Sequence, residues 1–147
     1  DINVHDLIKS SVTLVEQATK RKLNRIVNIN DKLQLFANRI ELHQLFFNII
    51  KNAYDATPDT GTIYITAQDQ NEKIQISIQD SGSGIPADIM DKMFIPFFTT
   101  KKVGSGTGLG LYWSLNIIKK HRGEIRAENS KSGGAIFTIT LPKAIKV

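Results

Sequence analysis

Residues 38–57, NRIELHQLFFNIIKNAYDAT, carry the strongest helical pattern in the chain. Apolar side chains recur at positions i, i+3, i+4, i+7, i+8 and i+11, which on an α-helix form one stripe that must be buried. The stripe consists of Leu42, Leu45, Phe46, Ile49, Ile50 and Ala53. The opposite, polar face carries Gln44, Asn48, Lys51, Asn52 and Asp55. Pro58 and Gly61 end the helix. The stretch therefore predicts an amphipathic helix with one buried and one polar side.

Strand patterns follow this helix on its C-terminal side. Residues 62–68 and 73–80 alternate between apolar and polar side chains, and the polar link 69–72 is short enough for an antiparallel hairpin. Residues 124–128 and 135–141 form a second pair of predicted strands around a Ser132-Gly133-Gly134 turn. Both pairs are local, which favours a mainly antiparallel sheet.

The remaining elements complete an α+β order. A short strand with Ile2 and Val4 precedes a predicted helix over residues 5–23, and strands at 25–29 and 33–37 follow it. A short helical segment runs to about residue 91, and another helix covers residues 107–120. The apolar residues that we expect to face inward from the first and last helices are Leu7, Ile8, Val12, Leu14, Val15, Leu109, Trp113, Leu115, Ile117 and Ile118. Helices that cover locally paired strands predict a two-layer α/β sandwich.

Composition limits the class of protein. The 147 residues, 41% of them hydrophobic, suit one globular domain. The net charge is +5, but the basic residues are scattered along the chain and do not alternate with aromatic residues in a binding motif. This argues against a nucleic-acid binder. The absence of cysteine excludes disulfides and thiolate metal sites and fits a reducing compartment. No apolar run is as long as a membrane span. The chain starts at Asp1 in patterned sequence, so we expect it to be part of a larger protein.

A glycine-rich stretch dominates residues 94–111, FIPFFTTKKVGSGTGLGL. Glycine at every second position, from Gly104 to Gly110, lets backbone N–H groups turn toward a ligand and form a cradle for anionic oxygens. The helix expected to begin near Thr107 adds the positive end of its dipole. The stretch is neither a P-loop nor a G-x-G-x-x-G fingerprint. It predicts phosphate binding, although alone it is equally compatible with a flexible surface loop.

Two further groups of polar residues suit a nucleotide. Asn48 and Asn52 are four residues apart, so both amides lie on one helix face near Asp55. Amide oxygens are ligands that Mg²⁺ accepts, although two solvated asparagines would produce the same pattern. Asp80 ends a strand before Ser81-Gly82-Ser83-Gly84-Ile85, where a carboxylate can accept a hydrogen bond from an exocyclic amine. A simple turn after a strand is the alternative.

Taken together, these motifs occur in a recognisable order. They are Asn48-x-x-x-Asn52-Ala53, Asp80-x-Gly82-x-Gly84-Ile85, Phe94-x-Pro96-Phe97-Phe98-Thr99-Thr100-Lys101 and Gly106-x-Gly108-x-Gly110-Leu111. The series closely resembles the N, G1, F and G2 boxes of the catalytic ATP-binding domain of bacterial sensor histidine kinases, from the first strand to Leu141-Pro142. The resemblance implies a Bergerat fold of the GHKL superfamily: a mixed, mainly antiparallel sheet covered on one face by three helices, with ATP beneath a mobile lid.

The resemblance also implies roles for single residues. Asp80 would contact the adenine amino group and Asn52 would ligate Mg²⁺. Asn48 and Lys101 would lie beside the triphosphate and act as catalytic residues in transfer of the γ-phosphate. The first part of the lid would extend from Phe94 to Lys101. The nucleotide-binding set implied in this way is Asn48, Asn52, Asp55, Asp80, Gly82, Gly84, Ile85, Phe94, Thr99, Thr100, Lys101, Gly104, Gly106, Thr107, Gly108, Leu109, Gly110 and Leu111.

The resemblance favours a kinase over a hydrolase. Related chaperone, gyrase and mismatch-repair ATPases usually place a glutamate where Asn48 stands, and an amide cannot take a proton from water at neutral pH. We expect the γ-phosphate to pass to a histidine on a separate dimerisation and phosphotransfer domain of the same protein, with a response regulator downstream. The expected location is cytoplasmic, in a parent protein that can be membrane-anchored, without contact of this domain with membrane or nucleic acid.

Alternatives and departures from the family pattern remain at this stage. A stand-alone ATPase or serine kinase of the same fold, and a docking module without nucleotide, are the other two hypotheses. Ala135 follows Gly133-Gly134 where the family often has a threonine, so a hydroxyl contact near the base would be missing. His5, His43 and His121 are expected at the surface or its boundary, not as phosphate acceptors.

Overall fold

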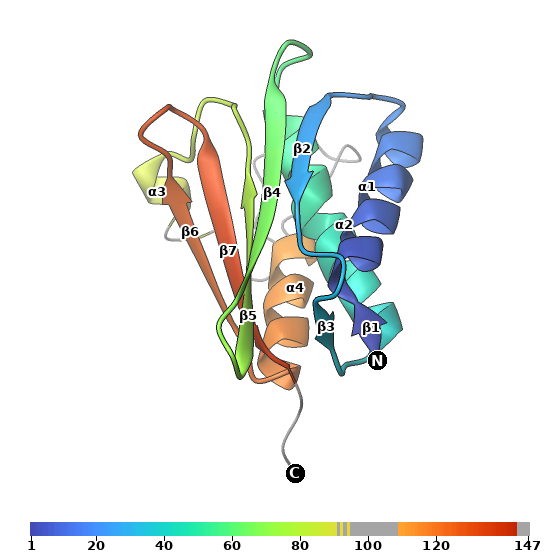
Figure 1. Cartoon of the computed structure of the whole chain (residues 1–147). Helices are drawn as coiled ribbons and strands as arrows, with labels where there is room; N and C mark the ends of the chain where they lie inside the picture. The colour runs from blue at the N-terminus through green and yellow to red at the C-terminus, as the bar shows by residue number, and fades with distance from the viewer. Residues whose placement is uncertain (91, 93, 95–108, 144–147) are drawn as a thin grey trace.

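The computed structural model describes residues 1–90, 92, 94 and 109–143 of the chain. In these residues, helices lie on one face of a twisted sheet, and a small second sheet lies near the N-terminus (Figure 1). The elements are β1 (Ile2–Asn3), α1 (Val4–Thr19), β2 (Asn24–Asn28), β3 (Gln34–Leu35), α2 (Arg39–Ala56), β4 (Thr62–Asp69), β5 (Lys73–Gln79), α3 (Ala87–Met90), α4 (Leu109–Lys120), β6 (Glu124–Asn129) and β7 (Ala135–Pro142).

The main sheet has the strand order β2-β4-β5-β7-β6. β2 and β4 are parallel, and the other neighbours are antiparallel. A parallel pair needs a crossover connection, and α2 supplies it here between β2 and β4. β1 and β3 form the separate two-stranded sheet. The predicted α+β sandwich with a mixed, mainly antiparallel sheet is confirmed.

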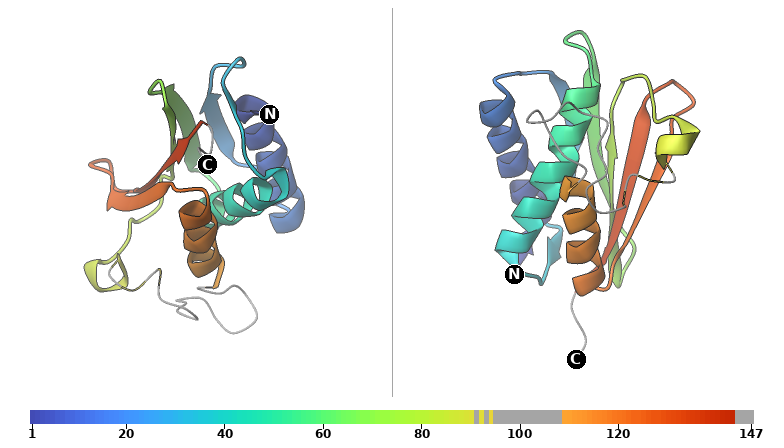
Figure 2. Two further views of the ribbon diagram at one scale, coloured as in Figure 1. Left: turned by 90° about the horizontal axis from the view of Figure 1, so that it is seen from below. Right: turned by 180° about the vertical axis from the view of Figure 1, so that it is seen from behind.

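Three helices cover one face of this sheet, as expected. α2 lies between α1 and α4 and packs against both, while α3 lies outside this layer near β6 (Figure 2). Asn38 caps the start of α2, because its side-chain oxygen accepts a hydrogen bond from the backbone N of Glu41 at 3.0 Å. α2 is therefore the central element that positions the other two helices.

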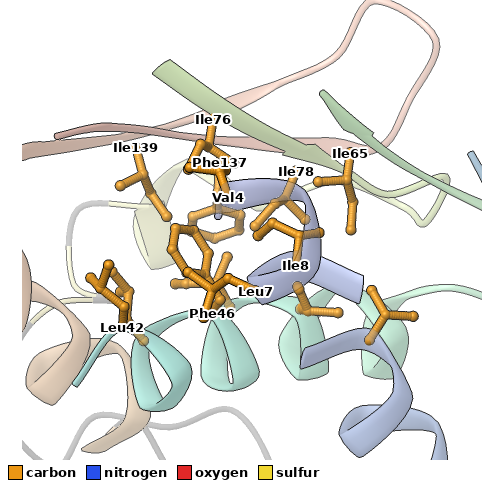
Figure 3. Packing of buried hydrophobic residues seen from close by; sticks show 14 of the residues in the cluster. Val4, Leu7, Ile8, Leu42, Phe46, Ile65, Ile76, Ile78, Phe137 and Ile139 are labelled. Atoms are coloured by element: carbon orange, nitrogen blue, oxygen red, sulfur yellow. The ribbon is translucent and has the colours of Figure 1, made fainter. Parts of the chain in front are cut away.

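The core fills the space between the helices and the sheet. Leu7 and Ile8 of α1 and Phe46 of α2 point toward Ile76 and Phe137 of the sheet (Figure 3). Every apolar residue predicted for the stripe of α2 is buried. Burying one such large side chain stabilises a fold by about 1.5–3 kcal/mol. The amphipathic pattern of residues 38–57 therefore predicted the centre of the core correctly.

Two inward-facing assignments were wrong. Leu14 is 46% exposed and Trp113 is 52% exposed, whereas Ser11 and Ser114 are fully buried. Each exposed residue lies at the margin of its helix stripe, while the small serine lies near the centre, where α2 approaches closely. Ser11 satisfies its hydroxyl by donating to the carbonyl oxygen of Leu7 at 2.8 Å. In both helices, hydrophobicity alone predicted the wrong side chain to be buried.

The histidine expectation was wrong at His121, which is only 5% exposed. Its Nδ1 lies 2.8 Å from the carbonyl oxygen of Ile117, and its Nε2 lies 3.4 Å from the backbone N of Asn38. An ion pair of 2.9 Å between Lys120 and Glu41 lies beside it. The end of α4 is thereby joined to the start of α2.

Element boundaries differ from the predictions by a few residues. α1 ends at Thr19 instead of residue 23 because Lys20 adopts a left-handed conformation with φ of 55°. Val4 belongs to α1 rather than to the first strand, since Asn3 caps that helix. Apart from Phe94, the expected lid lies outside the described residues, and so do the predicted helical residues 91, 107 and 108. Across the described ranges, no helix is both long and apolar enough to cross a membrane.

Candidate functional site

Asp80 lies directly after β5 and is the most deeply buried carboxylate among the predicted site residues, with 3% exposure. Its Oδ1 accepts hydrogen bonds from the backbone N of Gly82 at 2.9 Å and of Ala135 at 3.1 Å. A buried carboxylate is costly unless such bonds stabilise it. Within the described residues Oδ2 accepts none, so this oxygen can receive a hydrogen bond from a ligand.

The turn after Asp80 lies against the C-terminal end of α2. A Cβ on Gly82 would lie 2.2 Å from the carbonyl oxygen of Ala56, the last residue of that helix. Only glycine allows this close approach of two backbone segments. The structure thus brings the Asp80 turn and the polar end of α2 together, although the sequence separates them by more than twenty residues.

The polar face of α2 presents the two predicted asparagines. Asn48 and Asn52 are half-buried and lie one helical turn apart. Asp55 accepts a hydrogen bond from the Nζ of Lys51 at 2.9 Å, which orients this carboxylate along the helix. Two amide oxygens on one face are hard donors that suit Mg²⁺ when phosphate oxygens complete its shell.

Arg21, which sequence reasoning missed, holds the end of this helix. Its guanidinium donates to the carbonyl oxygens of Tyr54 at 2.5 Å and Thr57 at 2.7 Å, and to the carboxylate of Asp59. The last carbonyls of a helix need such partners. The only signal in the sequence is the basic run from Lys20 to Lys22, which looks like solvated surface.

A second network lies beneath the same helix end. The hydroxyl of Tyr54 donates to Glu16 at 2.9 Å, and Arg25 donates to the same carboxylate oxygen at 2.5 Å. Burial, and after it the hydrogen bond to Glu16, raises the pKa of the Tyr54 hydroxyl far above its ordinary value. Glu16 of α1 and Arg25 of β2 therefore hold the hydroxyl of Tyr54, near the end of α2.

Comparison with known proteins identifies the family. The model of the family described as histidine kinase-, DNA gyrase B-, and HSP90-like ATPase matches residues 37–145. The chain belongs to this ATPase family. The sensor histidine kinase ZraS of Escherichia coli is 38% identical over 143 residues, which are 96% of this chain and 30% of ZraS. Sporulation kinase A of Bacillus subtilis is 34% identical and is covered to 23%.

Solved structures agree with the family assignment. The nucleotide-free catalytic domain of the histidine kinase ThkA has a TM-score of 0.87 and 35% identity, with 97% of this chain and 94% of that chain covered. ThkA in complex with the response regulator protein TrrA has a TM-score of 0.79 and 30% identity, with 41% of that chain covered. The relatives are histidine kinases, so the predicted kinase branch of the ATPase family is confirmed. The chain spans less than a third of the length of these curated relatives.

The structure describes only part of the site that the ATPase family pattern predicts. Phe94 and Leu111 are half-buried and pack against the core. Leu109 and Gly110 begin α4. Seven predicted residues lie outside the described part of the chain: Thr99, Thr100, Lys101, Gly104, Gly106, Thr107 and Gly108. Asn129, which bonds the backbone of Ile85, was not foreseen either.

Proposed function

We propose that this domain binds Mg-ATP and presents the γ-phosphate to a histidine of a separate dimerisation and phosphotransfer domain, in two-component signal transduction. The observation that carries the proposal is the buried carboxylate of Asp80, whose Oδ1 is held by two backbone N–H groups. The family match and the kinase relatives support it. The domain would be the catalytic part of a larger sensor kinase, because its relatives are several times longer.

Adenine recognition follows from the chemistry of Asp80. Its Oδ2 would accept a hydrogen bond from the exocyclic amino group of the base. Guanine carries a carbonyl oxygen at the equivalent ring position, which would face the carboxylate with a second acceptor. Oδ1 cannot rotate away without breaking two backbone bonds, so the site would reject guanine.

The magnesium ion would be held at α2. Asn52 would supply a protein oxygen and Asn48 would lie beside the triphosphate, while the phosphates supply further oxygens. When bound, the ion neutralises the charge of the phosphates. The amide of Asn48 accepts no proton at neutral pH, so activation of water is poor and ATP is kept for the acceptor histidine.

The remaining phosphate contacts and the partners are also part of the proposal. Lys101, Thr99 and Thr100, with the glycines that follow, would hold the triphosphate, and Lys101 would act in transfer. The response regulator would act downstream, as the complex of ThkA with TrrA suggests for that kinase. We propose a cytoplasmic domain that itself binds neither membrane nor nucleic acid.

Calorimetric titration with ATP, with and without Mg²⁺, tests the binding step. We expect magnesium-assisted binding that Asp80→Asn weakens strongly and that loses its magnesium dependence in Asn52→Ala. Absence of binding in the unchanged domain would overturn the proposal in favour of a docking module.

Incubation with labelled ATP and a purified dimerisation and phosphotransfer domain tests the transfer step. We expect label on the histidine of that domain and slow release of ADP without it. Rapid ADP release without an acceptor, lost in Asn48→Ala, would instead support a stand-alone ATPase.

A further inference from the structure

The side chain of Asn129 bonds both backbone groups of Ile85. The backbone N of Ile85 donates to Oδ1 of Asn129 at 2.7 Å, and Nδ2 of Asn129 donates to the carbonyl oxygen of Ile85 at 2.9 Å. One carboxamide thus bonds the N–H and the C=O of a single residue, as the opposite residue of an antiparallel strand would. These two backbone groups have no other partner in the described part of the chain.

The position of Asn129 in the sheet connects it with Asp80. Asn129 is the last residue of β6 and lies opposite Ala135, the first residue of β7. Ala135 in turn bonds Asp80 twice, through its carbonyl oxygen at 3.0 Å and its backbone N at 3.1 Å. The two ends of the turn from Asp80 to Ile85 are therefore held by the same end of the β6–β7 pair.

The middle of the turn depends on this support. Gly84 has a φ of +85°, a conformation that side chains disfavour. A Cβ at this position would lie 2.9 Å from both Oδ1 of Asn129 and the carbonyl oxygen of Gly133. Ser81 and Ser83 on either side of Gly82 are exposed. Asn129 is thus the side chain that fixes how far the second half of the turn lies from Asp80.

We propose that Asn129 is a positioning residue for nucleotide binding, because its carboxamide fixes Ile85 and Gly84 at the distance from Asp80 that an adenine base requires. The inference rests on the proposed ATP binding. Asn129 is not among the residues proposed to hold the phosphates or Mg²⁺. A change at Asn129 should therefore affect binding of the adenine base alone. Its side chain lies at the surface, so the core does not depend on it.

The test compares Asn129→Ala with the unchanged domain by calorimetric titration with ATP, GTP and inorganic tripolyphosphate, alongside thermal unfolding. We expect ATP to bind about tenfold more weakly, which corresponds to about 1.4 kcal/mol, with a smaller preference for ATP over GTP. The affinity for tripolyphosphate is expected to stay unchanged. Glu128→Ala, on the neighbouring exposed side chain of β6, is the matched control and should bind ATP normally.

A second variant separates the two bonds. Asn129→Asp keeps the acceptor for the N–H of Ile85 and loses the donor to its carbonyl oxygen. Its ATP affinity should therefore lie between those of Asn129→Ala and the unchanged domain. Normal ATP affinity in Asn129→Ala, or an equal loss for ATP and tripolyphosphate, would overturn the positioning role. Failure of the unchanged domain to bind ATP would instead overturn the proposed function itself.

Discussion

Asp80 and Ala135 exchange two hydrogen bonds. The backbone N of Asp80 donates to the carbonyl oxygen of Ala135 at 3.0 Å, and the backbone N of Ala135 donates to Oδ1 of Asp80 at 3.1 Å. Oδ1 also accepts a hydrogen bond from the backbone N of Gly82, so this oxygen of the carboxylate stabilises the folded turn. The other oxygen is left for recognition, which means that substitutions can separate the two roles.

Asp80→Asn and Asp80→Ala should differ in stability but not in the loss of ATP binding. The asparagine keeps the oxygen that accepts both backbone bonds, whereas its NH₂ group cannot accept from adenine. We expect ATP affinity to fall by about 10- to 150-fold, the value of one hydrogen bond to a charged group. Asp80→Ala should lose binding equally and also unfold more easily, by about 1–3 kcal/mol for each orphaned N–H group. Urea unfolding and titration of both variants measure the two effects; equal stability would contradict the structural role of Oδ1.

Gly82→Ala should destabilise the domain. The added Cβ would lie 2.2 Å from the carbonyl oxygen of Ala56 and 3.0 Å from its carbon, and a helix backbone cannot move away cheaply. We expect a loss of about 1–3 kcal/mol in the free energy of unfolding, together with weaker ATP binding. Ser83→Ala, one residue beyond in the exposed part of the turn, is the control and should change neither quantity. A fully stable Gly82→Ala protein would mean that α2 and the turn are not packed as described.

Arg21→Ala should cost more stability than Asp59→Ala, although the two residues form an ion pair of 2.9 Å. The side chain of Asp59 is 89% exposed, and such a pair contributes at most about 1 kcal/mol. The bonds of Arg21 to the carbonyls of Tyr54 and Thr57 satisfy a helix end, and we expect a loss of about 1.5–3 kcal/mol without them. Urea unfolding of both variants decides between helix capping and the ion pair; equal losses would favour the ion pair.

Stability should fall at alkaline pH because of Tyr54. The folded state holds the proton of this hydroxyl more tightly than the unfolded state, since its pKa is raised. The contribution is fully present below the unfolded-state pKa of about 10 and is lost as pH rises from there toward the folded-state pKa. We expect a slope of up to about 1.4 kcal/mol per pH unit.

Unfolding curves between neutral and alkaline pH measure this slope in two variants. Tyr54→Phe should be less stable at neutral pH, by about 1 kcal/mol for the lost bond to Glu16, and should show a flatter alkaline decrease. Tyr64→Phe, a matched change on the exposed side of β4, should keep the decrease of the unchanged domain. The same slope in all three proteins would rule out Tyr54 as its source.

Local patterns in the sequence predicted most of the fold. The stripe from Leu42 to Ala53 and the alternation of Ile74, Ile76 and Ile78 are both buried as predicted, because helical and strand periodicity alone decides which side of an element is apolar. The order of the motifs around Asn48, Asp80 and Gly106 also identified the family correctly. The elements depend on residues close together in the chain, and the family is identified by short motifs in a fixed order.

Only the tertiary structure decided which side chains hold the site together. Ser11 and Ser114 are buried in place of Leu14 and Trp113 because the helices approach closely there, and no local pattern reveals that spacing. Arg21 reaches the end of α2 more than thirty residues away, and Asn129 reaches Ile85 across 44 residues. A single hydrogen bond between distant residues leaves no periodic trace in the sequence. The sequence by itself therefore determined the elements, most of the core and the family, whereas packing decided the remaining core positions and the polar side chains that position Asp80 and the end of α2.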